Sequence, residues 1–470
     1  MEELPITKQQ DYVPLHVHLD IGSNLIMLDS TIKVDKLVKQ CKEMGFKAVA
    51  ITDHVSLSGH VKLYQECNKH GIKPIIGLEP YLCDDINIKD NNSRYDHLIL
   101  LAKNDVGLKN LQFLSSVSWE KGFYYRPRLD YNLLEQYSEG LVCTEACLGG
   151  TIKKYLSKII YCEITMKTLE IDDIEKKDML NNHIKELKNN ITLTIKKFIN
   201  IFGKDNFYLE YQASNHPDQI PVNKKLKILA KHFGLKTIVT TDAHYLRPED
   251  KELHGILLKS KPSNEREQED FYDYTYIMTS DEIRQIMYPQ IGEEETELAM
   301  KNTVDIANSV EEYEIKHNPF MPDIKIPVFN YVGIFEQYYD IYPYFKMFAT
   351  SDNIYDKYWL YLIEKGYIEK NIKDKDNYRE YLQRINRELE VFWLISEKIN
   401  TSISAYHVTV LTIFDIVRKC GSLISCGRGS VGSFLICYIT DITQIDSIVY
   451  NLPYWRYAHE DRAEISDCDN

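Results

Sequence analysis

The sequence predicts an α/β fold, a sheet or barrel of short strands separated by helices, followed by a second domain. Segments with apolar residues at helical spacing alternate with short apolar strand segments along the first 240 residues. Glycines close several helical segments, as Gly45 and Gly71 do. A proline-containing segment, 318–331, then separates this part from a more helical remainder. Strands that alternate with helices are typical of a parallel sheet or barrel.

The elements follow this alternation in order. We expect helices over 32–44 and 61–70, and a charge-rich helical insertion over about 152–200. The strands that we expect are 47–51, 73–77, 97–102, 140–144, 206–210 and 236–240. Helical segments around 353–370 and 376–399 follow the proline-containing segment.

Composition excludes several classes of protein. The 470 residues are 44% hydrophobic and 27% charged, which is typical of a globular chain rather than a disordered one. No apolar run approaches the roughly 20 residues of a membrane span, and the polar start is unlike a signal peptide. Ten cysteines without a CxxC pair indicate reduced thiols and a cytoplasmic protein. The net charge of −14 argues mildly against nucleic-acid binding over the whole surface, although a local basic groove is compatible with it.

Metal-binding residue types recur where the predicted strands stop. His16 and His18 are two residues apart, so an extended chain places them on one side, and Asp242 and His244 repeat this spacing. The full set is His16, His18, Asp29, His54, Glu79, His97, Cys147, Asp242 and His244. In an α/β barrel the carboxyl ends of the strands converge on one face. We therefore expect a metal cluster of Zn²⁺ or Mn²⁺, with Glu79 able to bridge two ions.

Each residue of this set also has a simpler interpretation. A single histidine beside a strand is usually a satisfied polar residue, and a single cysteine such as Cys147 is usually a buried thiol. The recurrence at successive strand ends favours a cluster, and metals with a purely structural role remain the alternative to catalytic ones.

A glycine-rich run and a carboxylate pair mark the second part. Backbone N–H groups of such a run, the start of the following helix and an arginine can bind a triphosphate. The residues are Gly427, Arg428, Gly429, Ser430, Gly432 and Ser433. Asp467 and Asp469 have the spacing of two Mg²⁺ ligands on one strand face. Taken alone, the run is a common turn before a helix, and the pair a solvated terminus.

Seven segments, in order, resemble the PHP (polymerase and histidinol phosphatase) domain of C-family bacterial replicative DNA polymerases, the DNA polymerase III alpha subunit. They are 15–18, 50–54, 71–79, 97–104, 122–128, 146–150 and 241–246. The resemblance implies a distorted (β/α)7 barrel that holds three metals through the nine residues. It also implies phosphoesterase chemistry, with 3′→5′ exonuclease activity where the metal set is complete.

The second part resembles the palm of the same polymerases, a nucleotidyltransferase-like domain. The resemblance implies that the glycine run binds the incoming nucleotide and that Asp467 and Asp469 are catalytic, with Mg²⁺. The sequence departs from the family in three places. In the barrel part, the segment 19–28 is longer than usual, so that Asp20 competes with Asp29 as the metal ligand. In the palm part, the glycine run is one residue shorter and no proline directly precedes Asp467.

We expect three regions: a PHP barrel over 1–275, a linker or palm entry over 276–330, and a partial palm over 331–470. The family has a third palm carboxylate and further domains after such a pair. We therefore expect a split or truncated polymerase, inert alone and completed in trans by a C-terminal chain. Primer-template DNA, dNTPs and other replisome proteins are the expected partners, in the bacterial cytoplasm or a virus-infected bacterial cell. The alternatives are a stand-alone PHP nuclease or phosphoesterase and a non-catalytic replication scaffold.

Overall fold

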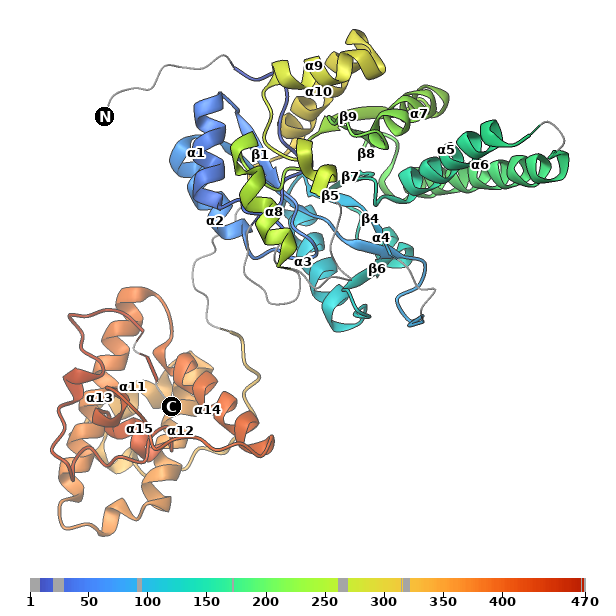
Figure 1. The fold of residues 1–470 in the computed structure, drawn as a ribbon. Helices are drawn as coiled ribbons and strands as arrows, with labels where there is room; N and C mark the ends of the chain where they lie inside the picture. Colours follow the sequence, from blue (N-terminus) through green and yellow to red (C-terminus); the bar gives the residue numbers. More distant parts are fainter. Residues whose placement is uncertain are drawn as a thin grey trace. The chain divides into compact units, whose positions relative to one another are not determined.

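The chain forms two compact units, Met1–Lys316 and His317–Asn470, in the computed structural model shown in Figure 1. The structure describes residues 9–19, 29–90, 95–170, 173–260, 269–313, 315, 322–465 and 467–468. All ten cysteines are free thiols, as predicted. Among the described residues, no helix combines the length and the apolar character that a bilayer crossing requires.

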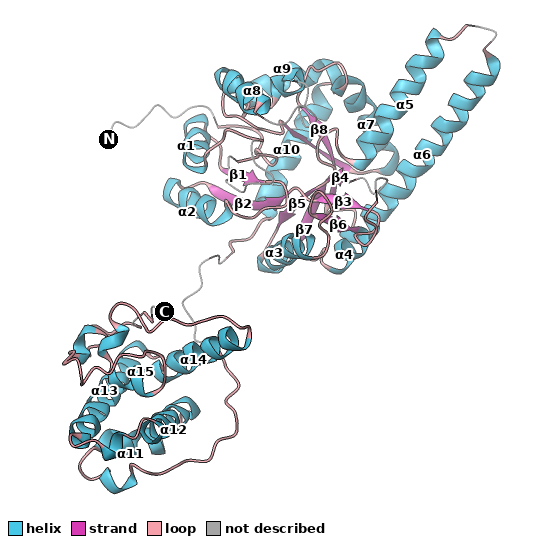
Figure 2. Ribbon diagram, turned by 60° about the horizontal axis from the view of Figure 1, so that its bottom comes forward, coloured by secondary structure: helices cyan, strands magenta, loops and turns pink. Residues whose placement is uncertain are grey.

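A curled six-stranded sheet lies at the centre of the first unit, with helices around it (Figure 2). Its strand order is β1-β2-β5-β7-β8-β9. The bounds are β1 (Ala48–Ile51), β2 (Lys73–Leu78), β5 (Ile99–Ala102), β7 (Leu141–Thr144), β8 (Phe207–Gln212) and β9 (Lys236–Thr240). Every residue of β1, β5, β7 and β8 is buried, which explains their nearly continuous apolar sequences.

The segment 14–18 closes this sheet into a ring. The Ala50 N–H of β1 donates to the Pro14 carbonyl at 2.9 Å. On the other side, the His18 N–H donates to the Ala243 carbonyl at 2.9 Å, just beyond β9. Six strands and one irregular segment therefore form the barrel, which confirms the predicted distorted seven-membered α/β fold.

The distortion has a topological cause. β5 runs antiparallel to both β2 and β7, whereas the other pairs are parallel. The sequence pattern predicted a parallel sheet, and this detail is wrong for β5. Between β2 and β5 the described residues form no helix but two short strands, and these join a third strand, which follows β5 in the chain, in a small sheet of order β4-β3-β6. These strands are β3 (Tyr81–Cys83), β4 (Asp96–His97) and β6 (Arg128–Asp130).

Helices cover the outside of the barrel. They are α1 (Val34–Met44), α2 (His60–His70), α3 (Asp105–Glu120), α4 (Tyr131–Gln136), α5 (Thr151–Thr168), α6 (Ile174–Phe202), α7 (Gln219–Phe233), α8 (Lys251–Lys259), α9 (Ser280–Ile291) and α10 (Glu293–Ser309). The predicted insertion is the pair α5 and α6, which extends away from the sheet in Figure 1. We expected a linker or palm entry over 276–330, but α9 and α10 share the barrel core through buried residues such as Met287 and Met300.

The second unit has its own core and, in its described residues, only helical elements. Its main helices are α11 (Pro343–Thr350), α12 (Ile354–Glu369), α13 (Tyr378–Ile399), α14 (Ile403–Lys419) and the short α15 (Leu435–Ile439). Aromatic residues such as Trp359 and Phe392 fill the core between them. The strand that we expected to carry Asp467 is not formed, since Asp467 and Cys468 lie in irregular backbone.

Candidate metal centre and nucleotide loop

The barrel brings the predicted metal ligands to one end. His54 and Glu79 follow β1 and β2, Cys147 follows β7, and Asp242 follows β9. His97 precedes β5, and because β5 is antiparallel its start lies at the same end as the ends of its neighbours. His16 and His18 arrive there on the closing segment 14–18. Asp20, the competitor of Asp29, falls outside the described residues.

Glu79 lies at the centre of four histidines. Its Oε2 atom is 3.0 Å from His18 Nε2, 3.3 Å from His16 Nε2 and 3.6 Å from His54 Nδ1. Its Oε1 atom is 2.7 Å from His97 Nδ1. The two carboxylate oxygens thus face different imidazoles, so Glu79 could bridge two bound ions.

Asp242 and Asp29 extend the cluster away from Glu79. Asp242 Oδ1 lies 3.1 Å from His16 Nε2 and 3.2 Å from His18 Nε2. Asp29 Oδ2 lies 3.3 Å from His54 Nε2 and 3.4 Å from His244 Nε2. Three groups of potential ligand atoms result, and they share His18 and His54. They are His16, His18 and Asp242; His18, Asp29 and His54; and His54, Glu79 and His97.

The donor atoms of this cluster fit bound cations. His54 Nδ1 is buried and makes no hydrogen bond with the described residues, and unsatisfied buried polar atoms are costly. The Nε2 atoms of His16 and His18 face each other at 3.3 Å. Imidazole nitrogens and carboxylate oxygens aimed at a common point suit Zn²⁺ or a similar ion. Cys147 Sγ is 3.6 Å from His97 Nδ1, so the thiol also reaches the cluster edge.

Opposite charges shape the cluster electrostatically. Burial would lower the pKa of His16, but the charges of Asp242, Glu210 and Glu79 outweigh it and raise the pKa to about 10. Burial would likewise raise the pKa of Glu79, but the neighbouring imidazoles hold it well below its usual range. The carboxylates are therefore ionised and ready to act as ligands, whereas the imidazole of His16 would have to lose a proton to bind an ion.

Glu210 supports His16 from behind, and the sequence analysis missed it. Its buried carboxylate accepts hydrogen bonds from His16 Nδ1 at 2.8 Å, from Thr240 Oγ1 at 2.5 Å and from Thr144 Oγ1. A carboxylate partner on Nδ1 leaves Nε2 of His16 free to face the cluster. The available signal was an acidic residue inside an apolar strand segment, because such a residue needs a buried partner.

His244 is oriented in a similar way by the backbone. Its Nδ1–H donates to the Asp242 carbonyl at 2.7 Å, so Nε2 is the ring nitrogen that faces Asp29, at 3.4 Å. Asp53, also missed, is buried beside the cluster, where its Oδ1 atom accepts the Leu19 N–H at 2.6 Å. Burial raises the pKa of Asp53 to about 7.

The glycine run of the second unit is a loop in which two glycines adopt the left-handed backbone conformation. Gly427 and Gly429 have φ of 96° and 73°, a region that favours glycine. Arg428 between them is exposed, whereas Ser433 is buried and its hydroxyl donates to the Ser430 carbonyl at 2.7 Å. The loop therefore presents Arg428 and backbone to solvent, while Ser433 closes the turn beneath.

The start of α15 is already occupied by a side chain. Glu388 is fully buried, and its carboxylate accepts the Leu435 N–H at 2.9 Å and the Ile436 N–H at 2.8 Å. Arg384 pairs with this carboxylate at 2.6 Å and also donates to the Ser433 carbonyl at 2.8 Å. We expected the start of this helix to help bind phosphate, but its first N–H groups are bonded to Glu388. Arg384 and Glu388 instead fix the loop to α13.

Cys468, which follows Asp467, is anchored to the core of the second unit. Cys468 Sγ lies 2.9 Å from the Tyr457 hydroxyl, and the Cys468 N–H donates to the Tyr406 hydroxyl at 3.3 Å. The ring of Tyr457 also lies 5.0 Å from that of Phe434, at the end of the glycine loop. Asp467 is exposed next to this anchor, and Asp469 falls outside the described residues.

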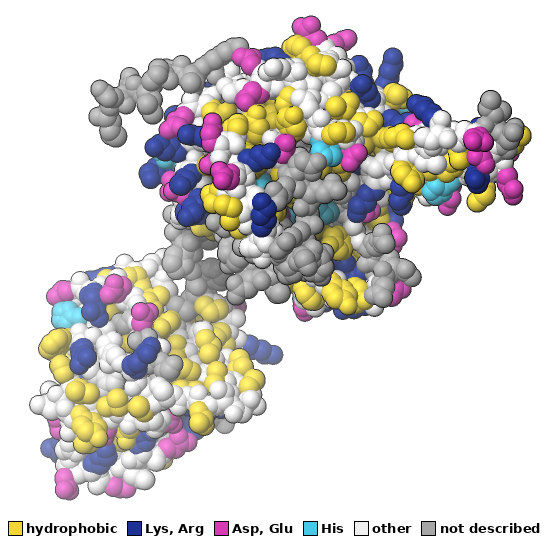
Figure 3. Space-filling view, viewed as in Figure 1, with side chains coloured by type: hydrophobic (Ala, Val, Ile, Leu, Met, Phe, Trp, Pro, Cys, Tyr) yellow, Lys and Arg dark blue, Asp and Glu magenta, His cyan; other side chains and the backbone are white. Residues whose placement is uncertain are grey.

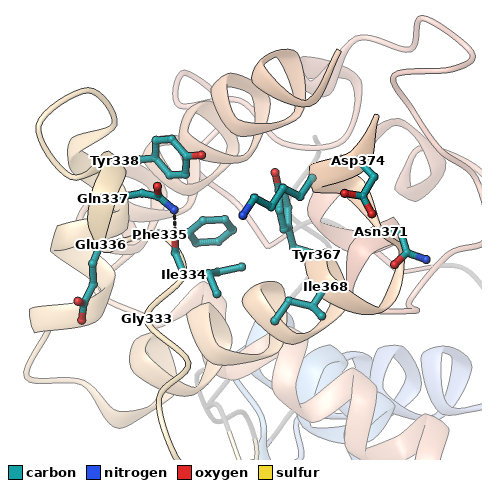
Figure 4. Close-up of a pocket in the computed structure, with 11 residues that line it drawn as sticks. Gly333, Ile334, Phe335, Glu336, Gln337, Tyr338, Tyr367, Ile368, Asn371 and Asp374 are labelled. Atoms are coloured by element: carbon teal, nitrogen blue, oxygen red, sulfur yellow. Dashed lines mark hydrogen bonds between the residues drawn. The ribbon is translucent and has the colours of Figure 1, made fainter. Parts of the chain in front are cut away.

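A separate pocket of about 540 Å³ lies in the second unit (Figure 4). It is lined by residues 333–338 and by the ends of α12 and η5 (Ile372–Asp374), with Phe335 and Tyr367 at its centre. The buried carboxylate of Glu364 fixes the turn at its rim by accepting the N–H groups of Gly333 and Phe335. None of the predicted site residues is among the residues that line it.

Two sequence families match the two units. The family described as "PHP domain" matches residues 14–214, and the "Bacterial DNA polymerase III alpha NTPase domain" matches residues 357–470. The chain belongs to the bacterial DNA polymerase III alpha family. The resemblance found in the sequence is thereby confirmed.

Relatives match nearly the whole chain. "Probable DNA polymerase YorL" of Bacillus subtilis and the "DNA-directed DNA polymerase" of Bacillus phage SPbeta are each 37% identical, over 97% of this chain and 36% of the relative. The "DNA polymerase III subunit alpha" of Aquifex aeolicus is 33% identical, over 98% of this chain and 36% of the relative. The chain thus spans just over a third of the length of these relatives.

Glu210→Gln should weaken metal binding by about 10- to 100-fold, the usual effect of losing the partner that orients a histidine ligand. Competition with a chromogenic zinc chelator measures the change. Glu295→Gln is the matched control, because Glu295 accepts a hydrogen bond from the adjacent Tyr211 of β8 at 2.9 Å but touches none of the named ligands. Equal metal affinity in the wild type and Glu210→Gln would contradict the support role.

The buried imidazole of His407 should make the second unit acid-sensitive. It bonds to the Ile403 carbonyl and the Tyr457 hydroxyl, both at 2.9 Å, and burial lowers its pKa to about 4. The unfolded chain takes up this proton near pH 6.5, so the free energy of unfolding should fall between pH 6.5 and 4, by at most about 3 kcal/mol.

Urea unfolding followed by tryptophan fluorescence tests this, since Trp359 lies 5.3 Å from His407 in the same core. The difference in unfolding free energy between wild type and His407→Asn should shrink as the pH falls. A difference that stays constant from pH 7.5 to 4 would show that His407 does not bind its proton differently in the folded state.

Proposed function

We propose that this chain supplies two parts of a DNA polymerase III alpha-type enzyme: a metal-dependent 3′→5′ exonuclease site in the barrel and part of the polymerase palm. The observation that carries the first part is the position of Glu79, whose two oxygens lie within 3.6 Å of four histidines. Membership of the polymerase family supports the second part.

The nine named side chains of the barrel would hold Zn²⁺ or Mn²⁺. Such ions supply Lewis-acid chemistry for phosphodiester hydrolysis. The protein's own contribution is orientation: Glu210 keeps the proton on Nδ1 of His16, and the Asp242 carbonyl keeps it on Nδ1 of His244. The rings of both histidines are thereby oriented with Nε2 facing the cluster.

In the palm, Asp467 and Asp469 would hold Mg²⁺, and Arg428 with Ser430 and the glycine backbone would bind the triphosphate. The exposed position of Arg428 and the fixed position of Cys468 support these roles. Phosphoryl transfer between two metals also needs further palm and finger residues. We propose that the regions which the longer relatives possess beyond the matched part supply these residues.

DNA primer-template and dNTPs are the proposed substrates, and replisome proteins in the bacterial cytoplasm the proposed partners. On the face seen in Figure 3, Lys and Arg side chains are interspersed with Asp and Glu. This mixture accords with the net charge of −14 and favours contacts made by a few placed residues over a broad basic strip.

With Mn²⁺ or Zn²⁺, the protein should shorten a 5′-labelled single strand from its 3′ end. His244→Ala removes one imidazole of the cluster and should reduce the rate to that of metal-free protein. His183→Ala, half-exposed on α6, is the control that should leave the rate unchanged. Denaturing gels read the product ladder; an intact strand, or equal digestion by His244→Ala, would refute the exonuclease proposal.

Mixed with a separately produced C-terminal region, the chain should extend a primer, and Asp467→Asn or Asp469→Asn should abolish extension. Loss of one carboxylate removes a ligand that clamps the reacting oxygens. Asp461→Asn is the control on the same segment, since its side chain is 86% exposed.

Barrel exonuclease activity should survive the palm substitutions. Exonuclease activity without any extension in the mixture would favour the stand-alone nuclease, and the absence of both activities would favour the scaffold. Extension that persists in the double Asn variant would show that the palm is assigned to the wrong residues.

A further inference from the structure

A segment rich in aromatic and basic residues, 122–128, leads into β6 of the small sheet, whose strands are labelled in Figure 2. The same sheet carries His97, one of the candidate metal ligands. In this sheet β3 lies between β4 and β6, and Tyr81 is the register partner of both His97 and Arg128. Neighbouring strands lie about 4.8 Å apart, so about 10 Å separates the Cα atoms of His97 and Arg128. The segment therefore ends two strand spacings from a candidate metal ligand.

Aromatic rings connect the metal centre to this segment. The rings of His54 and Tyr81 stack at 5.1 Å with an interplanar angle of 17°, and Tyr95 lies 4.6 Å from Tyr81. Arg126 lies two residues before Arg128, the register partner of Tyr81, so the segment brings it to the side of the centre that His54 and His97 form.

The base of the segment is rigid. Arg128 is fully buried and donates hydrogen bonds to the carbonyls of Gly122, Ile86 and Ile88 at 3.1 to 3.2 Å. At Gly122 a Cβ atom would lie 2.0 Å from the Arg128 carbonyl oxygen, so only glycine fits. The guanidinium of Arg128 also lies 5.2 Å from the ring centre of Tyr124.

Tyr125 stands out at the tip. It is 79% exposed, and its φ of 57° is a left-handed conformation that bulky residues avoid. The Tyr124 N–H donates to the Arg126 carbonyl at 3.0 Å across it, which fixes this tight turn. Strained backbone that the surroundings enforce is concentrated at functional sites. Here the strained residue is Tyr125, whose aromatic ring extends into solvent next to Arg126.

We infer that Tyr125 and Arg126 bind the single-stranded 3′ end of the DNA whose terminal phosphodiester enters the metal centre. A base stacks on Tyr125, and a backbone phosphate pairs with Arg126. This inference rests on the proposed exonuclease function and names the elements that receive its substrate. Every base has a π-face, so a stacking tyrosine accepts any sequence, as an exonuclease requires.

The binding step is measurable without hydrolysis. In EDTA, a short DNA strand with 2-aminopurine near its 3′ end should lose fluorescence on binding, because stacking on Tyr125 quenches it. Tyr125→Ala should remove most of this quenching and weaken binding about 5- to 100-fold, whereas Tyr125→Phe should retain both. Tyr161→Ala, on α5, is the control for an exposed tyrosine at 71% exposure and should bind as the wild type does.

The salt dependence tests Arg126 separately. Arg126→Gln removes one phosphate contact, so the slope of log affinity against log salt concentration should become shallower by about 0.7. The inference would be overturned if Tyr125→Ala bound the DNA and quenched its fluorescence as the wild type does. It would also be overturned if Tyr161→Ala or Tyr125→Phe lost as much binding and quenching as Tyr125→Ala. Stacking that is lost in Tyr125→Ala while no variant hydrolyses DNA with Mn²⁺ would support this site and refute only the exonuclease proposal.

Discussion

The first unit is organised around one buried carboxylate, that of Glu79. A charged group without water is stable in a protein only when partners surround it, and four imidazoles provide them here. These histidines come from the closing segment 14–18, from the loop after β1 and from β4. The barrel must therefore close correctly before Glu79 is satisfied. This requirement couples the fold of the first unit to the integrity of the centre.

The need to surround Glu79 with partners also explains the residues and strands that hold the proposed ligands in place. His16 reaches Glu79 and Asp242 only because the closing segment bonds to both edges of the sheet, and Glu210 fixes its ring from β8. Because β5 is antiparallel, His97 lies at the end of the barrel where the other proposed ligands gather. A parallel strand would have placed it at the opposite end. In the second unit, Arg384 and Glu388 have a comparable role, because they hold the glycine loop to α13 while leaving Arg428 exposed.

The sequence predicted the strands of the barrel well because each contains a short apolar run, and four of the six strands are buried along their whole length. It did not predict the direction of β5, because direction depends on the path between β2 and β5 rather than on periodicity. The strands β3 and β6, of three residues each, are too short to show a period. The nine proposed ligands could be named because His, Asp and Glu recur at strand ends. Glu210 was missed, because a single acid within a strand signals a buried partner but does not say which, and His16 is distant in sequence. The helices α9 and α10 pack on the barrel, although we expected a linker or palm entry over 276–330, because nothing in the local sequence of a helix says which core it will join.

Anomalous diffraction from crystals grown with Mn²⁺ or Zn²⁺, measured at the edge of each metal, tests the central claim most directly. The account predicts more than one anomalous peak among the side chains around Glu79, with a peak on each side of its carboxylate and Zn–N distances of about 2.0 to 2.1 Å where zinc is bound. A cluster without any peak at saturating metal, or peaks only at surface carboxylates, would contradict it.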